Sequence, residues 1–161
     1  MPAIVTKIPT MKDDDLLNLF HNASQMLSKG QNVDAESVLV AIEREWTARL
    51  NRARAGRYSA QTPAIGMLST LGYHVGTVQG EKTPIRRQIL KYLLERQLPM
   101  VGSPAYTDEW GAPNSRERYQ KLVRFLESFI NSPQQQDNAA AIIMWSEDLE
   151  WVQTTYAHLV K

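Results

Sequence analysis

The sequence predicts an all-α protein, and three observations lead to that prediction. Apolar residues recur at intervals of three and four along most of the chain, which is the spacing of one helix face. Helix start and stop signals alternate with these periodic stretches. Period-two alternation is confined to one short, glycine-rich stretch, so we expect no large sheet. A chain of 161 residues can form one core. We therefore expect six or seven helices in a single bundle-like domain, residues 1–161.

The first two predicted helices cover residues 11–29 and 33–54. Thr10, followed by Asp13, resembles an acidic variant of the capping box, in which a hydroxyl accepts a hydrogen bond from a backbone amide of the first turn. Gly30 is expected to end the first helix, because glycine readily adopts the left-handed conformation that follows a helix. The second helix carries apolar residues at helical spacing up to its basic C-terminal end.

A third, shorter helix is predicted over residues 63–71. It begins at a Thr-Pro pair and is expected to end at Gly72, with Tyr73 folding back onto its last turn as in a Schellman motif. Residues 73–78 contain β-branched residues among glycines, which is compatible with a small β-hairpin or with a shaped loop.

Four further helices follow from the same signals. We expect Thr83, with the proline after it, to cap the first of them, Asn114 or Ser115 to cap the third, and Asp137 or Asn138 to cap the last. The predicted ranges are 84–97, 104–110, 115–131 and 138–159.

The last predicted helix has the most regular pattern in the chain. Its apolar residues alternate at spacings of three and four, as in a coiled-coil seam of about 18 residues. Coiled-coil dimers usually need three or four heptads, so we favour a helix that docks along its own domain and keep homodimerisation as an alternative. The seam residues are Ile142, Trp145, Leu149, Val152, Tyr156 and Leu159.

The formal net charge of +1 hides a division of charge along the chain. Residues 44–124 contain 14 basic and 6 acidic residues, whereas the segments on either side are acidic. If the helices of this basic middle present their cations together, they form a surface that attracts phosphates. The alternatives are solvated helix faces, or basic residues that pair with the acidic ends of the same molecule.

Three basic clusters supply the candidate nucleic-acid-binding residues. Arginine suits this role because its guanidinium group can form two parallel hydrogen bonds to one phosphate. The candidates are Arg49, Arg52, Arg54, Arg57, Lys82, Arg86, Arg87, Lys91, Arg116, Arg118, Lys121 and Arg124.

No catalytic, metal or cofactor site is predicted. The glycine loop at residues 76–83 has the wrong spacing for a phosphate-binding loop and carries a carboxylate where phosphate would bind. The three histidines are far apart in the sequence, and His74 is left as a structural residue or a site residue. Glu147, Asp148 and Glu150 lie on the last helix and are expected to face solvent.

Large aromatic residues supply the candidate partner-binding residues, because tryptophan and tyrosine often anchor interfaces. The alternative is that they fill gaps between helices. The candidates are Tyr106, Trp110, Trp145 and Trp151.

The functional expectation is a non-enzymatic protein whose basic middle binds DNA or RNA, in a regulatory role or as an accessory of a mobile element. The alternative is a protein-interaction module or adaptor, which could form a homodimer through the last helix. Because the chain has no cysteine, no long apolar stretch and no signal-like N-terminal segment, we expect a cytoplasmic location and no membrane contact.

Overall fold

Regular structure in this protein is helical throughout the described residues, which are 2–30, 33–56, 65–78 and 80–161 of a computed structural model. These ranges contain seven α-helices and three short 3₁₀ helices, and no strand. The all-α prediction is confirmed. The chain divides into two compact units, one made of residues 1–64 and 97–107 and the other of residues 65–96 and 108–161.

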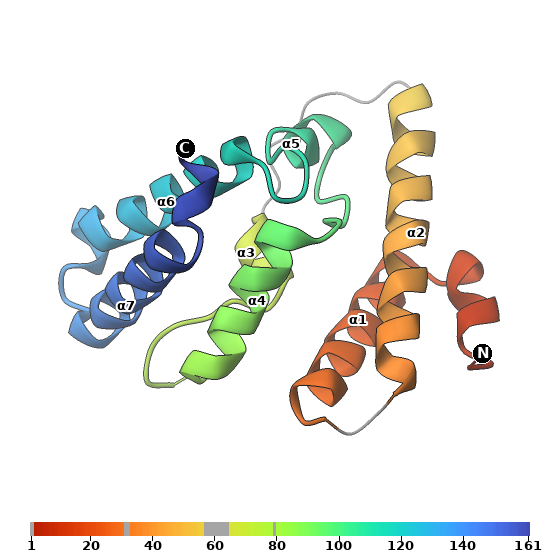
Figure 1. The fold of residues 1–161 in the computed structure, drawn as a ribbon, viewed down its shortest axis with the longest axis horizontal. Coiled ribbons are helices and arrows are strands. Elements are labelled where there is room, and N and C mark those ends of the chain that lie inside the picture. The colour runs from red at the N-terminus through yellow and green to blue at the C-terminus, as the bar shows by residue number, and fades with distance from the viewer. Residues whose placement is uncertain (1, 31–32, 57–64, 79) are drawn as a thin grey trace. The chain divides into compact units, whose positions relative to one another are not determined.

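The first unit is built around two consecutive helices, α1 and α2, which lie side by side and run in opposite directions (Figure 1). A 3₁₀ helix, η1, packs against α2. Phe20 of α1 meets Trp46 of α2 with ring centroids 5.2 Å apart, and both side chains are buried. The element bounds are η1 Val5–Thr10, α1 Asp13–Ser28, α2 Asp34–Ala55 and the short α5 Pro104–Asp108.

The start of α1 differs from the expectation, whereas its end agrees. Thr10 belongs to η1, and its hydroxyl donates to the carbonyl oxygen of Lys7 at 2.9 Å. The prediction that Thr10 caps α1 is therefore wrong, because that helix begins at Asp13 with Lys12 as its N-cap residue. Gly30 has φ +63° and its amide donates to Leu27, so the predicted helix end is confirmed.

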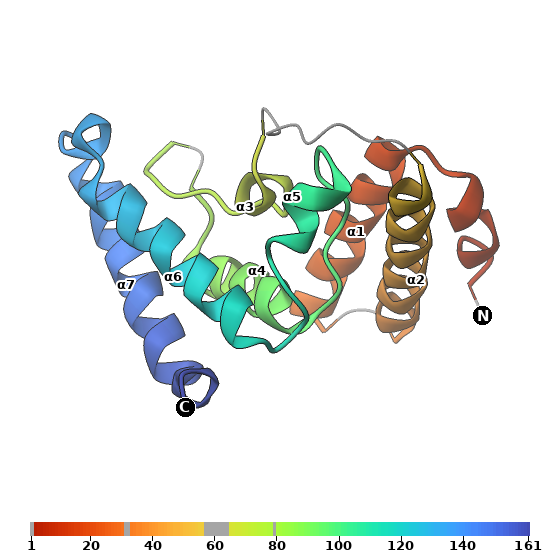
Figure 2. The same ribbon diagram turned by 90° about the horizontal axis from the view of Figure 1, so that it is seen from above.

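The second unit contains α3, α4, α6 and α7. Helices α6 and α7 pack along each other (Figure 2), and α4 packs on α7 (Figure 1). Leu122 and Leu126 of α6 and Val152 of α7 have no exposed surface. The bounds are α3 Met67–Thr70, α4 Thr83–Glu95, α6 Arg116–Asn131, η2 Pro133–Gln135, α7 Ala139–Thr155 and η3 Ala157–Leu159.

The helix caps of this unit decide between the predicted alternatives. Ser115 accepts a hydrogen bond from the Arg118 amide at 3.2 Å, and Asn138 accepts one from the Ala141 amide at 3.2 Å. Thr83 is not a cap, because α4 begins at Thr83 itself and Lys82 is its N-cap residue.

The segment between α3 and α4 is an irregular loop and not a β-hairpin. The amide of Tyr73 donates to Leu68 at 2.9 Å and Gly72 has φ +91°, so the predicted Schellman motif is confirmed. The amide of Glu81 donates to the carbonyl of His74 at 2.9 Å and closes the loop. No strand pairing occurs in its described residues.

The largest differences between predicted and observed helix bounds concern two helices. Of the predicted range 63–71, positions 63 and 64 lie outside the described residues, and α3 covers only Met67–Thr70. The range 138–159 corresponds to α7 followed by the separate 3₁₀ helix η3, because Tyr156 departs from helical geometry with ψ of 22°.

Candidate nucleic-acid interface

The first basic cluster lies at the C-terminal end of α2, and two of its arginines serve the fold. Arg49 pairs with Asp13, and its Nη2 donates to the carbonyl oxygen of Met11 at 2.7 Å. It also donates through Nε to Glu45 at 2.8 Å, and Arg52 donates to the same carboxylate oxygen at 2.9 Å. Arg49 thereby ties the start of α1 to α2.

These ion pairs shift the pKa values of Glu45 and Arg49. Burial alone raises the pKa of Glu45, but hydrogen bonds from Arg49 and Arg52 outweigh it, so the pKa lies below its ordinary value. Burial alone lowers the pKa of Arg49, but its bonds to Glu45 and Asp13 raise it. Arg54 is exposed and bonds to Asn51 at 3.0 Å, and Arg57 lies outside the described residues.

Arg86 of the second cluster is buried inside the second unit. Its side chain is 2 % exposed, and it forms a bidentate ion pair with the fully buried Asp148 of α7, through Nε at 2.7 Å and Nη2 at 3.2 Å. The hydroxyl of Tyr73 donates to the same carboxylate at 2.7 Å. Burial alone lowers the pKa of Arg86, but Asp148 raises it above its ordinary value. Asp148 was expected to face solvent; that prediction is wrong.

Arg118 of the third cluster is also buried, and it holds the end of one helix to the start of another. Its Nη1 donates to the carbonyl oxygens of Leu93 and Arg96 at the end of α4, at 3.0 Å and 2.6 Å. Its Nη2 donates to the carbonyl oxygen of Gly111 at 2.7 Å. Burial lowers the pKa of Arg118 to about 10. A guanidinium group can satisfy several carbonyls at once, which explains an arginine at this position.

The remaining candidates of these two clusters lie nearer the surface. Lys121 is mostly covered and pairs with Glu109 at 2.9 Å, while its Nζ lies 5.2 Å from the ring centroid of Trp110. Arg87 is half-buried, and its guanidinium carbon lies 5.6 Å from the ring centroid of Trp151. The exposed cations of α4 and α6 and their flanks, none of which forms an ion pair with a described residue, are Lys82, Lys91, Arg116 and Arg124.

The candidate partner-binding aromatics are mostly packed inside their own unit. Trp110 has no exposed surface and stacks on Phe125 at 5.4 Å. Trp145 is 8 % exposed and contacts Phe129 at 5.4 Å. Tyr106 and Trp151 are half-buried. For Trp110 and Trp145 the arrangement agrees with the gap-filling alternative.

Sequence reasoning missed two carboxylates that make buried or part-buried contacts, those of Asp148 and Glu95. Asp148 lies four positions before Val152 and three after Trp145, so a carboxylate occupies a position of the buried stripe. A charged residue at such a position is a signal for a buried ion pair. Glu95, whose carboxylate accepts a hydrogen bond from the Tyr156 hydroxyl at 2.8 Å, carries no comparable signal.

In the described ranges, no three side chains of His, Cys, Asp or Glu gather in a way that holds a metal ion. His74 is exposed beside the glycine loop. None of the described helices is both long and apolar enough to cross a membrane.

Comparison with known proteins gives no relative. No protein-family model, no curated protein and no solved structure matches this chain. Function must therefore be argued from the surface of the molecule.

Proposed function

We propose that this protein binds nucleic acid through exposed cations of its basic middle, in a regulatory or accessory role. One observation carries the proposal. Four of the candidate cations of the second unit are exposed and form no ion pair with any described residue: Lys82, Lys91, Arg116 and Arg124. Burial removes Arg86 and Arg118 from the proposed contact set.

These four cations are suited to phosphate contacts. They are solvated in the free protein, and each neutralised phosphate releases condensed counterions, so binding is favourable and depends on salt. The arginines on α6, eight residues apart, lie on its exposed side at positions separated by about 12 Å along the helix axis. Such contacts position a phosphate backbone without reading its sequence.

The test is fluorescence anisotropy with labelled single- and double-stranded DNA and RNA at low and near-physiological salt. Lys91→Glu and Arg124→Glu should each weaken binding and reduce the slope of log affinity against log salt by about one. Lys29→Glu is the matched control, because it makes the same charge change at an exposed residue of α1's C-terminal flank. No binding at low salt, or equal losses in all three variants, would overturn the proposal.

The alternative function, a protein-interaction module, has less support. It depended on Tyr106, Trp110 and the seam of the last helix, and Trp110 and Trp145 are covered by residues of their own unit. A stable protein partner that co-purifies, together with the absence of nucleic-acid binding, would favour this alternative.

A further inference from the structure

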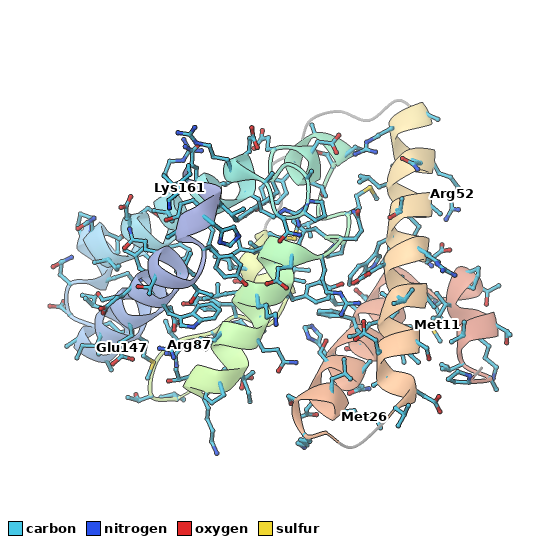
Figure 3. All side chains as sticks on the ribbon, viewed as in Figure 1. Met11, Met26, Arg52, Arg87, Glu147 and Lys161 are labelled. Atoms are coloured by element: carbon cyan, nitrogen blue, oxygen red, sulfur yellow. The ribbon has the colours of Figure 1, made fainter. Side chains whose placement is uncertain are left out.

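Helices α4 and α7 form a shared face in the second unit. Three pairs of side chains join them in the same order along both helices: Arg86 with Asp148, Arg87 with Trp151, and Glu95 with Tyr156. The two helices therefore run side by side in the same direction, and Figure 3 shows Arg87 between them. The border between them carries both a cation and an aromatic ring.

Trp151 differs from the other tryptophans of the chain. Trp46, Trp110 and Trp145 are 4 %, 0 % and 8 % exposed, whereas Trp151 is half-buried. The guanidinium group of Arg87 lies over its ring at 5.6 Å, and the edge of the ring meets Tyr156 at 5.9 Å. The Tyr156 hydroxyl is held by Glu95. The Trp151 ring is thus held by two neighbours, while the residue keeps part of its surface exposed to solvent.

Cations follow the same border. Arg87 and Glu95 both contact α7, and Lys91 lies midway between them, one helical turn from each. Lys91 is exposed and forms no ion pair with a described residue. Arg87 likewise pairs with no described carboxylate, and its buried Nε has no hydrogen-bond partner there. The ring of Trp151 is therefore the contact that orients the Arg87 head group.

Carboxylates restrict where a polyanion can lie on this face. Glu147 and Glu150 are exposed on α7, and Glu147 lies close enough to raise the pKa of Arg86. A phosphate backbone is repelled from that side and attracted by Lys91 on the α4 side.

We infer that the Arg87–Trp151 pair is a stacking platform for unpaired bases, and that Lys91 holds the adjacent phosphates of a single strand. Every base has a π-face that can stack on an aromatic ring or on a guanidinium plane. In a duplex those faces are covered by neighbouring base pairs, so this platform requires single-stranded DNA or RNA. The inference rests on the proposed nucleic-acid binding and adds a class of ligand to it.

The test uses the emission of Trp151, measured together with anisotropy on the full chain at low salt. The probes are a 20-nucleotide dT oligomer, a 20-nucleotide U oligomer and a duplex of the same length. We expect both single strands to quench tryptophan emission, and Trp151→Phe to abolish the quenching. Trp46→Phe is the matched control, because it removes a buried tryptophan of the first unit and should keep the quenching.

Two further variants separate stacking from charge. Trp151→Ala and Arg87→Gln should each weaken single-strand binding about tenfold, a loss typical of one stacked base, and leave duplex binding unchanged. Far-ultraviolet circular dichroism and urea midpoints show whether each variant folds, and Trp151→Phe, which keeps a ring, should bind nearly as well as the parent. Quenching by one of the two single strands alone would assign the platform to DNA or to RNA.

The outcomes distinguish this inference from the proposal beneath it. Anisotropy changes without quenching, or equal affinity for single strands and duplex, would overturn the stacking platform and leave nucleic-acid binding standing. The absence of an anisotropy change with every probe would overturn both.

Discussion

Arg86 and Asp148 form an ion pair that solvent does not reach, and this pair dominates the interior of the second unit. Both charges are removed from water. Their mutual contact compensates for the lost hydration, together with hydrogen bonds with the Tyr73 hydroxyl, the Glu81 carbonyl and the Thr83 hydroxyl. Replacing such a pair with apolar residues is often neutral, whereas removing one partner leaves a buried charge. The pair therefore contributes more to the specificity of the contact between α4 and α7 than to the net free energy of folding.

Asp148→Asn should lower the free energy of unfolding by about 3–5 kcal/mol, because Arg86 would stay buried without a counter-charge. Urea denaturation followed by circular dichroism measures the change. Glu147→Gln is the control, since Glu147 is exposed on the same helix and its replacement should stay within about 0.5 kcal/mol. A loss below 1 kcal/mol for Asp148→Asn would show that Arg86 finds water or another partner.

Alkaline pH should destabilise the protein through Tyr156. Burial raises the pKa of this hydroxyl, and its hydrogen bond to Glu95 raises it further. Above pH 10 the folded state keeps this proton, whereas the unfolded state releases it. The stabilisation that the buried hydroxyl gives the folded state is therefore complete below pH 10 and is lost as the pH rises. Between pH 10 and 11 the loss should be about 1 kcal/mol.

The comparison that isolates this effect is Tyr156→Phe against the parent in urea at pH 9, 10 and 11. The free energy of unfolding should fall less steeply with pH in the variant. Two other groups also make the free energy of unfolding depend on pH. Burial raises the pKa of Tyr73, which acts like Tyr156, and lowers the pKa of Arg118, which acts in the opposite direction. Both groups are present in the parent and in the variant, so their effects cancel in the comparison. Identical pH profiles would contradict the prediction.

In the loop between α3 and α4, one glycine determines the local backbone conformation. A Cβ atom built on Gly80 would lie 2.0 Å from the carbonyl oxygen of Gly76. Backbone approaches backbone there, so no side chain can turn aside to relieve the contact. The same loop touches α7, because the Gly76 amide lies 3.3 Å from the sulfur of Met144.

Gly80→Ala should therefore open this loop and lower the free energy of unfolding by about 1–3 kcal/mol. Amide hydrogen exchange at Glu81, whose amide bonds to His74, should speed up in the variant. Gly30→Ala is the control for a glycine with free space: its Cβ meets nothing within 4 Å, and only the strain of its positive φ is added. Unchanged exchange at Glu81 would contradict the prediction.

Much of the helical organisation follows from the sequence, because its determinants are local. Ser115, Asn138 and Gly72 end or begin helices through contacts within a few residues, so short patterns predict them. The candidate site depends on distant residues instead. Nothing local shows that Arg86 meets a carboxylate 62 positions away, or that Arg118 reaches the carbonyl of Leu93.

The seam of the last helix, α7, determines the oligomeric state that we expect of the whole molecule. Trp145, Val152 and Tyr156 are 8 %, 0 % and 4 % exposed, because α7 packs against α6 and α4. A second copy cannot use these side chains unless α7 leaves its own unit. These three seam residues are therefore covered within their own unit.

We therefore predict a monomer, with a mass near 18.3 kDa over the micromolar range in size-exclusion chromatography with light scattering. Ile143 is 57 % exposed on the opposite side of α7, so Ile143→Glu should leave the mass unchanged. A mass near twice the chain's, shifted back by Ile143→Glu, would show instead that this exposed side of α7 forms a dimer.

The contact between Arg86 and Asp148 also constrains how the protein is made. A ribosome adds about 5–20 residues per second, so Arg86 is synthesised roughly 3–12 seconds before its partner 62 positions later. Helices α1 and α2, which are adjacent in sequence, can pair much sooner. During that interval α4 lacks both its counter-charge and the α7 face that covers it.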